Sequence, residues 1–451
     1  MKLKKNSWIN GLIQWLNYQA QWLRPGLGIK RWVLLMIIGA SFIGLGLALF
    51  VVDTYFSTTT SWLVDLLAIL SLRGLPDWLR FSIVVGIGSV CIYFSFIGLS
   101  KNILQPFLPE GAAVFQAVSR FRRRQRGPKV VVLGGGSGLA SILRGLKKHT
   151  SNITAIITMA DNGGSSGELR RTVGTPPPGD IRNCLTALSE DEAMLTQVFQ
   201  YRFGKEYNMQ GHSLGNLFIT AMGDITGSFE EGVAEVGRVL AVTGQVLPAT
   251  LYDIHLAAAK INPETGEEKI IYGESEISKF PGRIKRVWLE PNDPPAFPPA
   301  IKAILSADLI IVGPGSLYTS LVANMLVPDI LRAVKASKAL RFYICNVTSQ
   351  PGETDGYSAQ DHANAFKKHL NEQIFDLVIC NDQFDDIDLP DNLNWVKPDD
   401  ISNNGYAIYS ANLVNKKKPT RHNSERLAEI VMDLFYERTG PLLAKDIGNM
   451  T

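Results

Sequence analysis

The chain has 451 residues, of which 46% are hydrophobic and 19% charged, which excludes an intrinsically disordered protein and suggests two or three domains. Its net charge of +3 conceals an asymmetry, because residues 1–129 hold 15 Lys and Arg against 4 Asp and Glu, whereas the remainder holds 30 against 38. Since the basic surplus is confined to the N-terminal part, nucleic acid is not expected as a partner.

Two long apolar runs occupy the basic N-terminal part. They span residues 32–52 and 81–99, each close to the length of about 20 residues that a helix needs to cross a bilayer. Basic residues flank the pair on its outer sides, while the connecting residues 53–80 carry only two arginines against three aspartates. The positive-inside rule therefore predicts a multi-pass protein of the cell membrane with both ends in the cytoplasm. We assign residues 1–128 to this membrane-anchoring region; its basic cluster at 120–126 is either close to anionic headgroups or a solvated linker.

A glycine turn opens the larger part of the chain. Residues 130–133 form a wholly apolar run that predicts a buried strand, the turn 134–138 follows, and an amphipathic segment, 139–148, begins at once. Strand, glycine turn and helix in this order present backbone N–H groups and a helix N-terminus to an anion. An ordinary tight turn without a ligand is the alternative. The residues expected to bind a phosphate here are Gly135, Gly136, Ser137 and Gly138.

A second loop of the same kind follows a second apolar run, residues 153–159. In a parallel sheet both loops lie at the carboxyl edge, where α/β proteins bind ligands. Asp161 ends this strand, where it would also suit the acidic ribose ligand of an NAD-dependent oxidoreductase, although the first loop fits a dinucleotide fingerprint poorly. Asp161 is in addition a candidate catalytic group and metal ligand. The expected ligand residues are Asp161, Asn162, Gly163, Gly164, Ser165 and Ser166.

Two further polar motifs follow. Residues 176–180 read Pro-Pro-Pro-Gly-Asp, and we expect Asp180 to be the N-cap of the next helix. Residues 211–216 read Gly-His-Ser-Leu-Gly-Asn, with His212 and Asn216 one helical turn apart and able to share a face. A lone histidine is also often a packing residue with satisfied hydrogen bonds. Asp180 and His212 are candidate catalytic groups, and the expected ligand residues are Asp180, Arg182, Asn183, His212 and Asn216.

The pattern changes over residues 238–299. Short β-rich runs at 238–242, 256–260, 270–272 and 284–288 are separated by Gly, Pro and charged turns, which predicts an antiparallel insertion.

The α/β pattern resumes after this insertion. An apolar strand at 308–312 and a helix at 317–326 enclose a third glycine–serine turn, in which Gly313, Gly315 and Ser316 are expected ligand residues. Strands are expected at 341–347 and 377–380, and a helix at 425–436. The polar loop 352–357 contains Glu353 and Asp355, which would bind a partner, a metal or a sugar hydroxyl unless the loop is an ordinary turn.

These patterns predict an α/β protein in which a two-helix transmembrane hairpin precedes a Rossmann-like parallel sheet with a β-rich insertion. Residues 129–451 form the expected nucleotide-binding domain. Neither a P-loop, nor a Ser-His-Asp order, nor a metal-spaced histidine cluster occurs in the sequence, and the four cysteines form no Cys-x-x-Cys pair.

Several ordered blocks resemble the gluconeogenesis factor family (YvcK-like), which is related to 2-phospho-L-lactate transferase (CofD). The resemblance is carried by VVVLGGGSGL, ADNGGSSGELR, PPPGDIRNCL, GHSLGNL, GPGSLYTS, GETDGY and the pair Asp361-His362, and it covers roughly residues 129–443. It implies a Rossmann-like fold that binds a nucleotide, in bacterial members a nucleotide sugar. Two positions depart from the pattern. Ser137 replaces an expected Thr and keeps the hydroxyl, whereas Asn162 replaces an expected Asp and puts a metal role of that pair in doubt.

The resemblance implies a regulator that binds a UDP-sugar without catalysis and links carbon metabolism to envelope synthesis and cell shape. One alternative is a CofD-like transferase that joins a phosphorylated small acid, of the 2-phospholactate type, to an acceptor through a nucleotide diphosphate, with Mg²⁺ as a candidate cofactor. The other is the NAD-dependent oxidoreductase. A homo-oligomer is expected.

Overall fold

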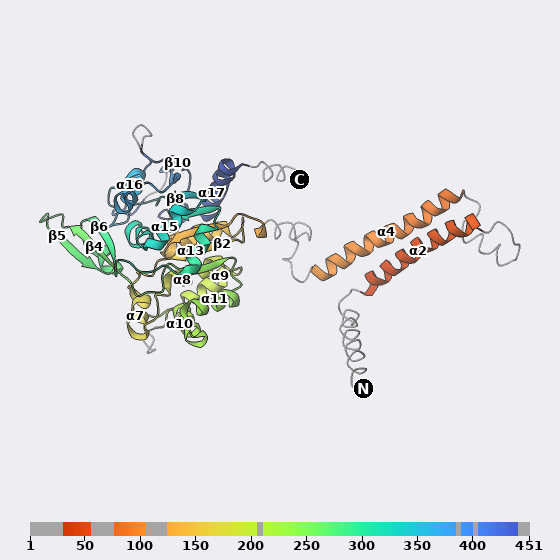
Figure 1. The fold of residues 1–451 in the computed structure, drawn as a ribbon, viewed down its shortest axis with the longest axis horizontal. Coiled ribbons are helices and arrows are strands. Elements are labelled where there is room, and N and C mark those ends of the chain that lie inside the picture. The colour runs from red at the N-terminus through yellow and green to blue at the C-terminus, as the bar shows by residue number, and fades with distance from the viewer. Residues whose placement is uncertain are drawn as a thin grey trace. The chain divides into compact units, whose positions relative to one another are not determined.

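The computed structural model describes residues 30–55, 76–104, 124–204, 211–384, 389–399 and 405–440 (Figure 1). The chain divides into two units, Met1–Phe121 and Arg122–Thr451. The described part of the first unit consists of helices α2 (Lys30–Tyr55) and α4 (Asp77–Leu104). The second unit contains the sheets.

Helices α2 and α4 are long and apolar enough to cross a membrane, over Arg31–Ala48 and Phe81–Asn102. They pack closely where two glycines meet. A Cβ atom on Gly39 would lie 2.8 Å from the carbonyl oxygen of Gly88, and a Cβ on Gly88 would lie 2.7 Å from that of Gly39. Small residues at such crossings let membrane helices approach each other. The pair therefore has the composition and the packing expected of a transmembrane hairpin.

The second unit is built on a seven-stranded parallel sheet, as predicted. Its strand order is β10-β9-β8-β7-β1-β2-β3. Strand β1 pairs with β2 on one side and β7 on the other, so that Val130 lies opposite both Ile153 and Leu309. The strands are β1 (Val130–Gly134), β2 (Ile153–Ile157), β3 (Gln245–Pro248), β7 (Leu309–Val312), β8 (Leu340–Ile344), β9 (Leu377–Asn381) and β10 (Ile408–Ala411).

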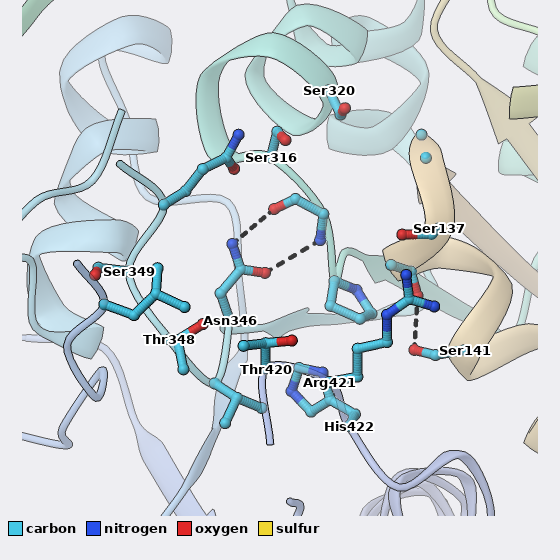
Figure 2. A pocket seen from close by; sticks show the side chains of 18 of the residues that line it. Ser137, Ser141, Ser316, Ser320, Asn346, Thr348, Ser349, Thr420, Arg421 and His422 are labelled. Carbon is cyan, nitrogen blue, oxygen red and sulfur yellow. Dashed lines mark hydrogen bonds between the residues drawn. The ribbon is translucent and has the colours of Figure 1, made fainter. Parts of the chain in front are cut away.

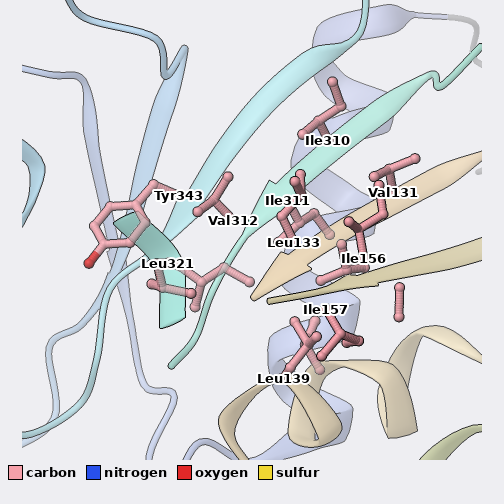
Figure 3. Close-up of a cluster of buried hydrophobic side chains, with 14 of the residues drawn as sticks. Val131, Leu133, Leu139, Ile156, Ile157, Ile310, Ile311, Val312, Leu321 and Tyr343 are labelled. Atoms are coloured by element: carbon pink, nitrogen blue, oxygen red, sulfur yellow. The ribbon is translucent and has the colours of Figure 1, made fainter. Parts of the chain in front are cut away.

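Helices cover this sheet and bury a continuous apolar core. Every residue of β1, β2, β7 and β9 is buried, as their largely apolar sequences predict for a sheet covered on both faces. Figure 3 shows Leu133 and Ile156 of this core together with Leu139, Leu321 and Tyr343. The helices are α6 (Gly136–Leu146), α7 (Gly164–Val173), α8 (Gly179–Leu188), α9 (Glu192–Gln200), α10 (Leu214–Thr226), α11 (Phe229–Val239), α13 (Pro298–Leu305), the π-helix η2 (Leu317–Val322), α14 (Ala323–Met325), α15 (Pro328–Ala336), α16 (Ala359–Leu370) and α17 (Ser424–Thr439).

The predicted antiparallel insertion is present as a second sheet of order β5-β4-β6. It consists of β4 (His255–Ile261), β5 (Glu268–Tyr272), the short helix α12 (Glu274–Lys279) and β6 (Arg283–Glu290).

The strand predicted at residues 238–242 is wrong. This stretch is the end of α11 and the turn after it. Phe229, Val233, Val236 and Leu240 are all buried, and their spacing of three to four residues places them on one helix face. The apolar residues here therefore continue a helical stripe, and the next strand, β3, is the edge of the main sheet.

Candidate functional site

Three glycine–serine loops meet at the carboxyl edge of the main sheet because β7, β1 and β2 are neighbours. The first and third loops face one cavity of about 500 Å³, while the second loop does not line it (Figure 2). The cavity is completed by the loop after β8 and by the residues that precede α17. Its wall consists of Gly135, Gly136, Ser137, Gly138, Ser141, Pro314, Gly315, Ser316, Ser320, Asn346, Val347, Thr348, Ser349, Gln350, Pro351, Leu393, Thr420, Arg421 and His422.

The first turn has a backbone that only glycine forms easily. Gly136 begins α6 with a φ of +68°, in the left-handed region. A Cβ atom on Gly138 would lie 2.6 Å from the carbonyl oxygen of Pro314, so glycine allows the first turn to touch the third. The N-terminus of α6 thus lies in the cavity wall, where it suits an anion.

The third turn is held from β8. Asn346 Oδ1 accepts a hydrogen bond from Gly315 N–H at 3.2 Å, and Asn346 Nδ2 donates to the Gly315 carbonyl at 2.8 Å (Figure 2). A helix follows this turn as predicted, but its first part is the π-helix η2. π-helical turns are frequent at functional sites. The two bonds fix the backbone of Gly315 in the cavity wall.

Arg421 supplies the positive charge of the cavity. It is exposed, and Figure 2 shows its side chain extending toward Ser137 and Ser141. Within the described part of the chain its guanidinium has no ion pair, and no carboxylate lines the cavity. The neighbouring His422 is neutral at pH 7 because burial lowers its pKa to about 4. The wall therefore offers a cation, hydroxyl groups and backbone N–H groups, which together fit a phosphorylated ligand.

The residues of the second loop and the two later motifs come together in a separate, largely buried network. Asn216 Nδ2 donates to Ser165 Oγ at 3.0 Å, and Ser165 Oγ lies 3.1 Å from His212 Nδ1. The other ring nitrogen of His212 is 3.4 Å from Glu168 Oε2. Because both ring nitrogens have protein partners, His212 fits the packing interpretation as well as the catalytic one.

Arg182 extends this network to the acidic residues. It is only 8% exposed, donates to Asn216 Oδ1 and Asn183 Oδ1 at 3.0 Å each, and also bonds Ser213 Oγ. Burial lowers its pKa, while the carboxylates of Asp180 and Asp161 act in the opposite direction. Arg182 therefore neutralises buried acids instead of facing the cavity.

Asp180 does not have the predicted role. The N-cap of α8 is Pro178, whose φ of −84° and ψ of −9° are already helical, so Asp180 lies inside the first turn of the helix. Its carboxylate instead accepts the backbone N–H of Gly136 in the first glycine turn. Burial and the neighbouring Asp161 raise its pKa to about 6. A carboxyl group with a pKa of about 6 thus lies directly behind the cavity wall.

Glu274 of the insertion is a third acid at this place, and the sequence did not indicate it. A Cβ atom on Gly163 would lie 3.9 Å from Glu274 Oε2 and 3.5 Å from Asp161 Oδ1, so the two carboxyl groups flank this glycine. Burial, followed by the charges of Asp161, Glu353 and Asp180, raises the pKa of Glu274 to about 7. Burial also raises the pKa of Asp161, against the hydrogen bond from Gly163 N–H at 2.8 Å.

Among the described residues no three His, Cys, Asp or Glu side chains are placed to hold a metal. Mg²⁺ commonly takes only one or two carboxylates together with substrate phosphates, a donor set that Asp161 and Asp180 would fit. Asn162 has a different use, because its Oδ1 accepts Ser275 N–H at 3.0 Å and so ties the second loop to α12.

The loop at residues 352–357 also has a supporting role. Glu353 is 2% exposed, and its carboxylate accepts hydrogen bonds from Ser278 Oγ, Thr319 Oγ1 and Gln350 Nε2. Burial raises its pKa, although the hydrogen bonds from Ser278 and Thr319 act against that rise. The buried ammonium of Lys260 donates to the carbonyls of Ile277, Phe280 and Gly352. Glu353 thus joins the insertion, η2 and the cavity loop instead of offering its oxygens to a ligand.

Comparison with known proteins agrees with this architecture. Residues 130–414 match the family model described as 2-phospho-L-lactate transferase CofD. The gluconeogenesis factor of Bacillus subtilis is 42% identical over 322 residues, 69% of this chain and 99% of the relative. A relative from Nostoc sp. is 43% identical over 443 residues, 93% of each chain. A solved UPF0052 family member from Bacillus halodurans has a TM-score of 0.61 and 42% identity, and covers 68% of this chain and 99% of its own. The chain therefore belongs to the gluconeogenesis factor family, with a CofD-type domain.

Proposed function

We propose that this protein binds a nucleotide sugar in the cavity between the first and third glycine turns. The observation that supports this proposal most is the composition of the wall, in which two glycine turns and Arg421 line one cavity and no carboxylate is present. The diphosphate lies across the turns beside Arg421, because helix N-termini and guanidinium groups both favour phosphate. Asn346, Thr348 and Gln350 line the same cavity and offer hydrogen bonds to sugar hydroxyls.

A regulatory role without catalysis fits this cavity best. The wall has no carboxylate, and burial lowers the pKa of its one histidine, His422, to about 4, so the wall offers only a weak general base. We propose that the bound sugar nucleotide reports the supply of envelope precursors and links carbon metabolism to envelope synthesis and cell shape. The name of relatives such as the gluconeogenesis factor of Bacillus subtilis supports only the part of this proposal that concerns carbon metabolism.

A CofD-like transferase is the second candidate, and the position of Asp180 favours it. The carboxyl group of Asp180 bonds to Gly136 N–H, and its raised pKa allows it to hold or release a proton beside the proposed phosphates. Asp161 lies close enough to Asp180 to raise its pKa, and these two carboxyl groups would hold Mg²⁺ on a diphosphate. An NAD site is less well supported, since the cavity wall has no acid to bind a ribose diol.

Calorimetry on the detergent-purified full chain tests the assignment. We expect UDP-sugars to bind with a Kd in the micromolar range or below and NAD to give no heat of binding. Phosphorus NMR of the same mixture over several hours separates the two candidates. An unchanged diphosphate supports the regulator, whereas its cleavage in the presence of Mg²⁺ and a phosphorylated acid supports the transferase. Binding of NAD without binding of any uridine nucleotide would replace both by the oxidoreductase.

We further propose that α2 and α4 cross the cell membrane and leave the second unit in the cytoplasm. The support is the apolar length of both helices and the basic residues outside the pair. Alkaline phosphatase fused at Thr59, which lies outside the described residues, should be active, and a fusion at the C-terminus should be inactive. An active C-terminal fusion would contradict this topology.

A further inference from the structure

A second cavity, of about 630 Å³, lies between the insertion and the end of α16. We call it the basic cavity and define it by Lys285, Arg286, Trp288, Asn292, Lys368 and His369, with four apolar or amide neighbours. It shares no wall residue with the cavity at the glycine turns. It is therefore a separate place on the second unit.

The wall of the basic cavity carries cations without matching acids. Three of its residues, Lys285, Arg286 and Lys368, are positively charged, and none is Asp or Glu. Lys285 has an ion pair with Glu268, but Arg286 and Lys368 have none within the described ranges. Both lie near enough to His369 to lower its pKa. Two exposed, unpaired cations that repel each other across one concavity are stabilised by an anion between them.

His369 forms a fixed, neutral part of this wall. Its Nε2 accepts the backbone N–H of Val287 at 3.2 Å, so its Nδ1 carries the proton and donates to the Ala365 carbonyl at 2.8 Å. Burial is the main cause that lowers its pKa. Val287 belongs to β6, an edge strand of the insertion sheet. The histidine therefore ties the end of α16 to the insertion and holds the two cations on a rigid frame.

The same histidine also contacts the π-helix that leaves the third glycine turn. The His369 ring packs edge-on against Tyr318 with a centroid separation of 5.4 Å. Tyr318 lies in η2, directly after Leu317 and Ser316, and its Oη is 2.9 Å from Tyr357 Oη. A shift of β6 or of the end of α16 would thus reach the wall of the first cavity through one aromatic contact.

We propose that the basic cavity binds a small soluble polyanion with at least two phosphate groups. The volume matches ordinary small-molecule sites, and Arg286 and Lys368 supply the charge that such a ligand needs. A bilayer presents its phosphates on a broad surface, so a concave site favours a dissolved molecule. The ligand acts as an effector of the first cavity through His369 and Tyr318. This effector role rests on the proposed function of the first cavity.

Inorganic pyrophosphate is the probe, titrated by calorimetry into the detergent-purified full chain. The protein carries Arg421→Ala, so that the first cavity contributes little to the measured binding of pyrophosphate. We expect binding that is weakened at least tenfold by adding Arg286→Gln and Lys368→Gln together. The matched control is Lys367→Gln, an exposed neighbour on α16 outside the cavity, which should change the affinity less than twofold. Equal affinity in the double variant and the control would overturn the site, whatever the first cavity binds.

The effector role has its own readout in protein that keeps Arg421. The affinity for a UDP-sugar is measured with and without pyrophosphate, in wild type and in Arg286→Gln/Lys368→Gln. Direct competition at the first cavity affects both proteins equally, so any difference between them is coupling between the sites. We expect a difference of at least threefold. The same response in both proteins would overturn the effector role.

Discussion

Replacing Arg421 by alanine should weaken the binding of a UDP-sugar by about 100-fold, which corresponds to about 2.7 kcal/mol. The side chain is the cation in the wall of the cavity, and a guanidinium can donate two parallel hydrogen bonds to a phosphate. Stability should change little, because Arg421 is exposed and has no ion pair in the described residues. Calorimetry gives the affinity, and a thermal melt of the same sample gives the stability.

Two further variants separate the charge from the shape of the loop. Arg421→Lys keeps the charge but loses the paired geometry, so it should fall between wild type and Arg421→Ala. Lys418→Ala removes an exposed cation from the same turn outside the cavity and should bind normally. Normal affinity in Arg421→Ala would show that the diphosphate lies elsewhere. A loss in Lys418→Ala as large as in Arg421→Ala would point to a disturbed loop.

Replacing Glu353 by alanine should produce the largest loss of stability among the variants considered. The change leaves the donors of Ser278, Thr319 and Gln350 without their acceptor and removes the negative charge that acts most strongly on Lys260. Removing one member of a buried charged network costs roughly 3–5 kcal/mol. We expect the melting temperature of the second unit to fall by roughly 5–15 °C, with weaker UDP-sugar binding because Gln350 lines the cavity.

Asp355→Ala is the matched control for this prediction. Asp355 lies two residues further along the same loop, is exposed, and accepts only the backbone N–H of Gly352 in the described structure. Its removal should lower the melting temperature by no more than about 2 °C, as for most surface changes. If Glu353→Ala and Asp355→Ala melted at the same temperature as wild type, the carboxylate of Glu353 would not hold the insertion to the sheet.

The sequence predicted those parts of the fold that depend on local pattern. Apolar runs without interruption marked β1 and β7, and a run interrupted only by Thr154 marked β2, because a strand covered on both faces needs few polar residues. The three glycine–serine turns followed from the same strands, since each occurs where a parallel strand ends. Short β-rich runs separated by Gly, Pro and charged turn residues indicated the three strands of the insertion. The edge strand β10 was not predicted, because two of its four residues are exposed and its apolar signal is weak.

The composition of the site depended on contacts between distant segments, which a single sequence does not reveal. Arg421 reaches the first turn from a loop more than 280 residues later, and no local motif marks it. Glu274 enters the acidic group only because Asn162 ties α12 to the second loop. The residues around Asp180 predicted a helix N-cap, whereas its carboxylate accepts a hydrogen bond from the backbone N–H of Gly136 in another loop.

The most direct test of the account is a crystal structure of residues 124–451 with a UDP-sugar. The diphosphate should lie between the turn at Gly135–Gly138 and Gly315, with its oxygens within hydrogen-bond distance of the guanidinium of Arg421 and of backbone N–H groups at the start of α6. A diphosphate bound instead at the second loop, against Asp161 and Glu274 and away from Arg421, would contradict the proposed site.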